Sequence, residues 1–393
     1  MRRAFLTFFS ILLLFTGTCW LIVGWFVVDD LGGWSRLALL WAVCVSPASV
    51  LAYNIATHGY PSSFVRCTLY RLFWYSQFLV VMLVIPTLLG FLIGLPFGHG
   101  YDVGRSVVLA GSAVLVVLGL IGYAGSRGLV VRHLDVQLPQ LPAALDGLRI
   151  AQLSDTHVGP HTSPSHLRKA AQFTRDAKPD LIAFTGDQVD DYPRDMEVFQ
   201  QYFGDLRAPL GVHAITGNHD VYAGWHEVRP RLERMGVNVL VNSATRITHN
   251  GADFWLGGTG DPAGYQMARF AQNGASPAPD IDATLSAVPT GAFHIVLAHN
   301  PALFGPLAQR GVPLTLSGHT HYGQLAIPAL NWCLASPFLR FAMGAHVVDR
   351  SALYINPGTN YWGIPFRIGT PPEVTVLTLR RGSGAPLIKN GRG

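Results

Sequence analysis

The hydrophobic positions of this chain follow two different patterns, which change near residue 125. Before that point, long runs of Leu, Val, Phe, Gly and Trp carry few charges; after it, short apolar runs end in polar turns. A helix needs about 20 predominantly apolar residues to cross the hydrocarbon core of a bilayer. The first pattern therefore predicts an α-helical transmembrane bundle, with spans at Phe5–Val28, Leu37–Ala56, Phe73–Phe97 and Val107–Tyr123.

Two of these ranges admit a second interpretation. Leu37–Ala56 is the least apolar of the four, since it contains Ser46, Pro47 and Asn54, and the alternative for it is a segment that does not span. Phe5–Val28 resembles a signal peptide in position, but its apolar region is long and no clear cleavage site follows it. We therefore expect residues 1–125 to form a four-span anchor.

The arginines between the spans predict an orientation, because cytoplasmic loops carry an excess of Lys and Arg. The N-terminus, the second loop and the segment after the fourth span hold six arginines, whereas the first and third loops hold two. This asymmetry predicts a multi-pass protein of the cell membrane whose C-terminal domain is cytoplasmic. The six are Arg2, Arg3, Arg66, Arg71, Arg127 and Arg132, and the two are Arg36 and Arg105.

The second pattern predicts an α/β domain. Apolar runs bounded by Gly and polar residues indicate buried strands, and stretches such as His166–Ala177 and His226–Met235 have the polarity of connecting helices. Open α/β sheets bind ligands beyond the carboxyl ends of their strands. The predicted strands are Leu148–Leu153, Leu181–Thr185, Val212–Thr216, His294–Ala298, Leu314–Leu316, Trp255–Gly257, Leu353–Asn356 and Val374–Leu379.

Five of these strands run directly into turns that carry carboxylate, imidazole and amide groups, with no thiolate. Such a ligand set favours a site for Mn, Fe, Zn or Co over a cysteine-based structural zinc site. Because residues i and i+2 of an extended segment point to the same side, each Asp-x-His or His-x-His pair directs two ligands at one cluster. The candidates are Asp155, His157, Asp187, Asp190, Asn218, His219, Asp220, His299, His319 and His321.

The order of these turns resembles the calcineurin-like metallophosphoesterase superfamily, in particular its membrane-associated bacterial members. The resemblance rests on Asp155-x-His157, Gly186-Asp187-x-x-Asp190, Gly217-Asn218-His219-Asp220, Leu297-Ala298-His299-Asn300-Pro301 and Gly318-His319-Thr320-His321, with a late Gly363-Ile364-Pro365-Phe366-Arg367. Members of this subgroup usually have glycine after the last histidine, where this chain has Tyr322. The resemblance therefore does not predict the shape of the pocket. The resemblance implies a β-sandwich flanked by helices over residues 146–382, after a linker at 126–145 and before a flexible tail at 383–393.

The resemblance also implies two divalent metal ions. Asp187 would bridge them, and a hydroxide between them would attack phosphorus. His219 would be the general acid or the donor to the leaving group, Asp220 would orient His219, and Asp190 would be a supporting residue or a turn cap. The two implied ligand sets are Asp155, His157, Asp187 and His321, and Asp187, Asn218, His299 and His319.

Charge and cysteine content narrow the function further. The formal net charge is +5 and 13% of residues are charged, without a run rich in Lys or Arg. No nucleic-acid binding is therefore indicated. The four cysteines form no CxxC pair, so neither a zinc knuckle nor a redox pair is expected.

The substrate is suggested only by aromatic and apolar residues near the turns. We expect Tyr222, Tyr322, Tyr361 and Arg367 to contact a phosphorylated substrate. The stretch Leu325–Ala342 has two interpretations: a flap that meets acyl chains or the bilayer, or a hairpin that packs on the domain core. Together with the spans, it favours a lipid-linked phosphate or pyrophosphate.

Two other classes of function remain possible from the sequence. One is a non-catalytic metal-binding membrane receptor or scaffold, against which the complete ligand blocks argue. The other is a transporter with a regulatory soluble domain. The interiors of the four spans lack the ionisable residues that a substrate pathway normally contains, which disfavours transport.

Overall fold

The computed structural model describes residues 2–57, 59–268 and 277–391. It divides into two compact units, Met1–Ile121 and Gly122–Gly393. The first unit is helical. Its helices are α1 (Arg2–Val27), α2 (Leu31–Val45), α3 (Pro47–Thr57), α4 (Tyr70–Gly94), preceded by a π-helical turn at Val65–Leu69, and α5 (Gly100–Gly125).

Four described helical segments are long and apolar enough to cross a membrane, which confirms the predicted number. They are Phe9–Val27, Leu31–Asn54, Val65–Phe97 and Gly100–Gly125. The second segment consists of α2 and α3, which meet at Ser46. Pro47 is the first residue of α3, a position where its missing N–H leaves no intrahelical bond unmade.

The helical unit buries a small cluster that includes Phe9, Ala48 and Phe73, with the two phenylalanine rings 5.7 Å apart. Many outward side chains are also apolar; Leu14, for example, is 72% exposed. Helices that are apolar on all sides are typical of membrane spans.

The second unit is a β-sandwich flanked by helices, as predicted. Its larger sheet holds seven described strands in the order β15-β1-β14-β2-β3-β4-β5. They are β15 (Leu387–Asn390), β1 (Val130–Leu138), β14 (Glu373–Arg381), β2 (Arg149–Leu153), β3 (Leu181–Phe184), β4 (Val212–Ala214) and β5 (Asn238–Val239).

The facing sheet holds six described strands in the order β12-β13-β9-β8-β7-β6. A separate pair, β10 (Ala326–Ile327) with β11 (Trp332–Cys333), lies in a loop after β9. The six are β12 (Gly344–Val348), β13 (Ser351–Ile355), β9 (Leu314–Ser317), β8 (His294–Leu297), β7 (Ala252–Gly258) and β6 (Ser243–His249).

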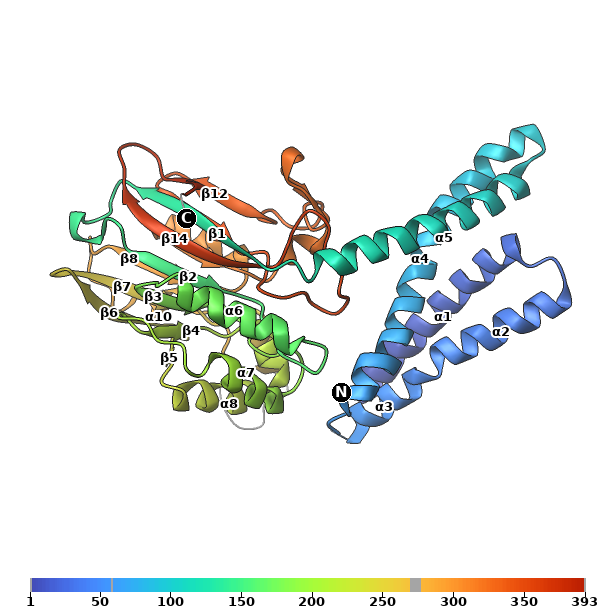
Figure 1. Ribbon diagram of the computed structural model, residues 1–393, viewed down its shortest axis with the longest axis horizontal. Helices are drawn as coiled ribbons and strands as arrows, with labels where there is room; N and C mark the ends of the chain where they lie inside the picture. The colour runs from blue at the N-terminus through green and yellow to red at the C-terminus, as the bar shows by residue number, and fades with distance from the viewer. Residues whose placement is uncertain (1, 58, 269–276, 392–393) are drawn as a thin grey trace. The chain divides into compact units, whose positions relative to one another are not determined.

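Alternation along the strands builds two cores. In β3, Leu181 and Ala183 face the core between the sheets. Ile182 and Phe184 belong to the core on the other face, as the period of two requires. Helices α6 (Pro164–Asp176), α7 (Met196–Phe203) and α8 (Asn218–Arg234) cover that face (Figure 1). The shorter helices are α9 (Ala263–Ala268), α10 (Ile281–Leu285) and α11 (Phe304–Gln309).

The strand directions bring the predicted turns together. β2, β3 and β4 are parallel in one sheet, and β8 and β9 are parallel in the other. Parallel neighbours end at the same edge, so each sheet presents its turns along one edge. The interactions described below show that these edges meet.

The ends of the domain differ from the expectation of a linker at 126–145 and a flexible tail at 383–393. Val130–Leu138 is an interior strand that pairs with β14 and β15, and Leu387–Asn390 is the edge strand beside it. The reason is hydrophobic: Leu134, Val136 and Leu138 are buried between the sheets, so this stretch contributes to the core.

Candidate metal centre

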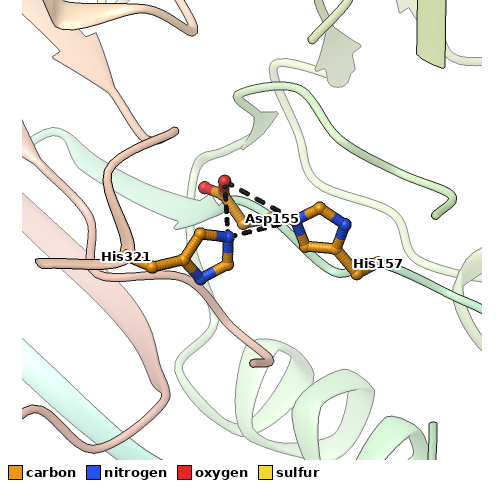
Figure 2. Close-up of side chains that lie close together, drawn as sticks. All are labelled: Asp155, His157 and His321. Carbon is orange, nitrogen blue, oxygen red and sulfur yellow. Dashed lines mark hydrogen bonds and ion pairs between the residues drawn. The ribbon is translucent and has the colours of Figure 1, made fainter. Parts of the chain in front are cut away.

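Asp155, His157 and His321 form the first of two groups of candidate ligands. Asp155 and His157 follow β2, and His321 follows β9. The Nε2 atom of His321 lies 3.2 Å from an Asp155 carboxylate oxygen and 3.0 Å from the Nε2 atom of His157. Figure 2 shows the three side chains pointing toward one another. Their ligand atoms all lie within 4.8 Å of one another, so one cation can contact all three.

The second group surrounds Asn218, which follows β4. Its Oδ1 atom lies 2.8 Å from the Nδ1 atom of His319 and 3.2 Å from the Nε2 atom of His299. The Nε2 atom of His299 also lies 3.2 Å from Asp187 Oδ2. The structure therefore brings the second implied ligand set together as well.

Asp187 stands between the two groups. Its Oδ2 atom lies 3.2 Å from His299 and 3.6 Å from the Nε2 atom of His157. Its other oxygen accepts the backbone N–H of His219 at 2.8 Å. One carboxylate oxygen thus faces histidines of both groups, which is the position required of a bridging ligand.

Electrostatics keep these carboxylates ionised. Burial opposes ionisation of Asp187, but the facing His299 and His219 outweigh it and lower the pKa of that carboxyl. Burial likewise opposes ionisation of Asp155, and His321 and His299 lower its pKa. Ionised carboxylates beside imidazole nitrogens form a donor set of O and N atoms, which fits divalent cations of the Mn, Fe or Zn type.

Burial also disfavours the charged form of two histidines, and there it prevails. It lowers the pKa of His319 to about 4, together with repulsion from His299. It also lowers the pKa of His321 to about 4, against the attraction of Asp155. Both rings are therefore neutral near pH 7, and a metal ligand must be a neutral imidazole.

The backbone at the ligands is strained. Asp155, His157, Asp187, His319 and His321 have φ values of 52°, 39°, 53°, 72° and 47°. The left-handed region is rare for non-glycine residues, and such conformations gather at functional sites where the surrounding fold holds them. Five of the seven predicted ligands share this conformation, which supports a functional rather than an incidental cluster.

Two motif glycines are required because the chain approaches the ligands closely. A Cβ atom on Gly318 would lie 2.2 Å from an Asp155 carboxylate oxygen, and one on Gly217 would lie 2.2 Å from Asp187 Oδ1. No other residue fits at either position without displacing a ligand. The glycines before Asn218 and His319 are thus part of the construction of the site.

Asp220 is placed differently from the expectation that it orients His219. Its carboxylate is fully buried and accepts backbone N–H groups of Asp187 and Gly217, at 2.9 and 2.8 Å, and of Gln188 and Val189, at 2.9 and 3.3 Å. Burial and the neighbouring Asp187 raise the pKa of Asp220 to about 7, against the backbone N–H groups of Gly217 and Val189. Asp220 therefore fixes the Asp187 loop and is a positioning residue.

His219 is oriented instead by Asp190. The Nδ1 atom of His219 donates to the backbone carbonyl of Asp190 at 2.6 Å. The carboxylate of Asp190 lies 3.3 Å from the Nδ1 atom of His157 and 3.6 Å from His161, consistent with the supporting role expected of it. Burial disfavours a charged His219, but Asp187, Asp190 and Asp191 outweigh it and raise the pKa of the ring.

Arg367 lies in the interior. Its side chain is 1% exposed, and its guanidinium donates to the Nδ1 atom of His321 at 2.9 Å and to the carbonyls of Thr370 and Asn360. Because a guanidinium only donates, the Nε2 atom of His321 carries the proton of the neutral ring and directs it at Asp155. A bound cation would replace that proton, and Arg367 holds the ring in place.

We expect Arg367→Ala to weaken metal binding by about 10–100-fold, as loss of residues that orient metal ligands commonly does. Arg367→Lys keeps the charge but lacks the planar fork, so its effect should be smaller but still measurable. Titration of the metal-free protein with Mn²⁺ measures the change, with Arg310→Ala as a surface control. An unchanged affinity in a folded Arg367→Ala protein would contradict this role.

The three tyrosines expected to contact substrate differ in exposure. Tyr222 is 48% exposed, and its ring lies 5.7 Å from that of His219. Tyr322 is buried, and its hydroxyl donates to the carbonyl of Ile355 and accepts the N–H of Gly344. Tyr361 is also buried and donates to the carbonyl of His161. Tyr222 is the one of these three placed where a ligand beside His219 would meet it.

Two residues near the site, Asn360 and Asp261, were absent from the predicted set, whereas Trp362 is one of the aromatic residues expected near the turns. Asn360 donates to the carbonyl of Thr156 at 3.0 Å and so supports the turn after β2. Trp362, 50% exposed, has its ring 5.8 Å from that of His219. Asp261 is 1% exposed, and burial raises the pKa of its carboxyl to about 6. A signal existed for Asn360, because a polar turn follows the predicted strand Leu353–Asn356.

Comparison with known proteins agrees with this geometry. Residues 148–323 match the family model described as calcineurin-like phosphoesterase. Proteins named "Transmembrane protein with metallophosphoesterase domain" are 34% identical in Danio rerio, over 69% of this chain, and 30% identical in Bos taurus, over 68%. An uncharacterised metallophosphoesterase of Aquifex aeolicus is 27% identical over 68% of this chain and 98% of its own length.

The chain spans 61% of the length of each of the two vertebrate relatives. The match to the family model includes the candidate ligands from Asp155 to His321. The fold, the site and the relatives agree, so this chain carries a calcineurin-like metallophosphoesterase domain that follows four apolar helical segments in the sequence.

Proposed function

We propose that this protein is a hydrolase of phosphoester or pyrophosphate bonds that depends on two divalent metal ions. The observation that carries the proposal is the meeting of two ligand groups at Asp187. Two cations held there would supply an activated water molecule and neutralise charge on the phosphoryl oxygens. Asp155, His157 and His321 would hold one cation, Asn218, His299 and His319 the other, and Asp187 both.

His219 is the chain's best candidate for the leaving-group side of the reaction. Its side chain is 12% exposed, more than those of Asp155, His157, Asp187, His299 and His321. With Nδ1 bonded to the Asp190 carbonyl, Nε2 is left to donate a proton to a departing oxygen. The raised pKa keeps the ring protonated to higher pH, which suits a general acid.

We expect His219→Ala to lower kcat by about 10²–10⁴-fold on a phosphoester with a poorly leaving alcohol, the usual size of a general-acid contribution. On p-nitrophenyl phosphate the loss should be much smaller, because nitrophenolate departs without a proton. Steady-state kinetics of both substrates with Mn²⁺, in detergent-solubilised full-length protein, measure the difference. His226→Ala, a histidine of the same helix outside the site, is the matched control.

Equal losses on both substrates would contradict the acid role of His219 while leaving metal-dependent hydrolysis intact. Full metal occupancy without turnover of monoesters, diesters or pyrophosphates would instead favour a metal-binding receptor or scaffold. That second result would overturn the proposed hydrolase itself.

We further propose that the substrate is lipid-linked and that the second unit, Gly122–Gly393, here termed the catalytic unit, lies on the cytoplasmic side of the cell membrane. The four apolar helices support a membrane site of action, and the distribution of arginines between the spans supports the side. Reporter fusions after residue 391, one active only in the cytoplasm and one only outside it, test the orientation. Activity of the outside reporter alone would reverse it.

A further inference from the structure

The stretch 325–342 of the catalytic unit, here termed the apolar hairpin, exposes an unusual number of large apolar side chains. Ile327 is 45% exposed, Leu330 71% and Phe338 81%, and Leu334 and Leu339 are 41% and 38% exposed. Contiguous apolar surface on a folded domain usually marks a contact with a protein, a ligand or a membrane. The hairpin therefore calls for a partner.

The other side of the apolar hairpin is packed, so its outward face is held in place. Ala326, Cys333, Phe341 and Ala342 are buried in a cluster with Phe304. The pair β10–β11 and the bond from the N–H of Leu334 to the carbonyl of Leu325 close the hairpin. The packing interpretation drawn from the sequence therefore holds for the inward side chains, and the membrane interpretation concerns only the outward ones.

The base of the hairpin is bonded to the segment 366–368. Backbone N–H groups of Ala326 and Ile368 donate to the carbonyls of Ile368 and Gln324, at 2.9 and 3.0 Å. The amide of the Gln324 side chain donates to the carbonyl of Trp362 and accepts its N–H. Gln324, the residue before the hairpin, thus bonds the base of the hairpin to Trp362.

The same segment packs on the last turn of α5, whose final residues belong to the catalytic unit. The N–H of Arg367 donates to the carbonyl of Gly122 at 2.8 Å. A Cβ atom on Gly125 would lie 2.0 Å from the Arg367 carbonyl oxygen, so glycine is needed for this contact. Gly122 and Gly125 are also the last-turn residues of a candidate span, Gly100–Gly125, so the segment bonded to the hairpin contacts the end of that candidate span.

The charge of the hairpin suits the headgroup region of a membrane. Residues 325–342 contain no acidic residue, and their one charged side chain is Arg340, which is exposed between Leu339 and Phe341. Surfaces that insert at a membrane interface combine apolar side chains with basic ones that meet anionic lipids. A protein partner would require no such proximity to a membrane span.

We propose that the apolar hairpin docks on the bilayer that holds the spans, with Leu330 and Phe338 inserted among the lipids. This docking surface is independent of the hydrolase activity. It has a consequence for that activity, because Trp362 is bonded to Gln324 at the base of the hairpin and its ring lies beside that of His219. The docked domain presents the metal site beside the membrane surface, where a lipid-borne phosphate can reach it.

A photo-crosslinking experiment on full-length protein tests the docking. p-Benzoylphenylalanine replaces Phe338 or Leu330 in protein reconstituted into vesicles of phosphatidylcholine and phosphatidylglycerol that carry a fluorescent phosphatidylglycerol. Irradiation should give several-fold more fluorescent protein from these positions than from Val198, an exposed apolar residue of α7. The probe replaces exposed side chains, so the fold should tolerate it.

Adduct yields at Phe338 and Leu330 no higher than at Val198 would overturn the proposal, as would crosslinks to a second copy of the chain instead of lipid. Hydrolysis of p-nitrophenyl phosphate by the same labelled proteins separates this result from the proposed function. Lipid adducts with no turnover would leave the docking standing and the hydrolase in question. Turnover without adducts would do the reverse.

Discussion

Asp187→Ala will remove nearly all phosphoesterase activity and metal binding at both ligand groups. Oδ2 of Asp187 is the atom that faces His157 and His299, one from each group, so its loss opens both positions at once. Metal ions stabilise a phosphoryl-transfer transition state by several kcal/mol, and about 4 kcal/mol corresponds to about a thousandfold in rate. We expect a fall in kcat/KM of at least that order.

The measurement is hydrolysis of p-nitrophenyl phosphate with Mn²⁺, together with the metal content of the purified protein. Asp187→Asn keeps one oxygen and the bond to the His219 N–H but not the charge, so it should retain some metal and little activity. Asp205→Ala, which removes an exposed partner of Arg175, controls for surface charge. Activity that persists unchanged in Asp187→Ala would rule out the proposed function.

Asp220→Ala will produce the largest loss of stability among single substitutions at the site. The carboxylate is the acceptor for backbone N–H groups of Asp187, Gln188, Val189 and Gly217 in a fully buried position. Each buried donor left without an acceptor costs about 1–3 kcal/mol. Because some donors will find water, we expect the free energy of unfolding of the catalytic unit to fall by about 4 kcal/mol.

Thermal or denaturant unfolding of the metal-free protein checks this value apart from any effect of bound metal. Asp220→Asn retains one carbonyl oxygen and should lose about half as much, because two donors then face an amide NH₂ group. Asp282→Ala, on the surface beside Arg310, should unfold like the parent. A stable Asp220→Ala protein that lacks only activity would instead assign Asp220 a direct part in the reaction.

The sequence predicted a strand and its ligand-bearing turn correctly wherever both lie within one short stretch of the chain. The apolar runs of β2, β3, β4, β8 and β9 predicted those strands to within two residues, and each polar turn followed its strand. The meeting of two separate sheet edges could not be derived from periodicity. It depends on contacts such as Asp155 with His321, 166 positions apart in the numbering, and only the family resemblance paired them.

The misjudged residues show what local patterns leave out. Leu134, Val136 and Leu138 alternate as a strand should and belong to β1, but the prediction placed their stretch in a linker. Asp220 stands next to His219 in sequence, yet on α8 consecutive residues point in different directions, and its carboxylate serves the β3 turn instead. Arg367 became interpretable only when its contact with His321 was known.

The position of β1 has a consequence for biosynthesis. β1 leaves the ribosome directly after the last span but pairs with β14, and the Arg132–Glu373 bond joins residues 241 positions apart. A contact of such long range forms late. Until Glu373–Arg381 has been made, the nascent domain holds a strand with unpaired backbone groups at the membrane, a stage at which chaperones would matter most.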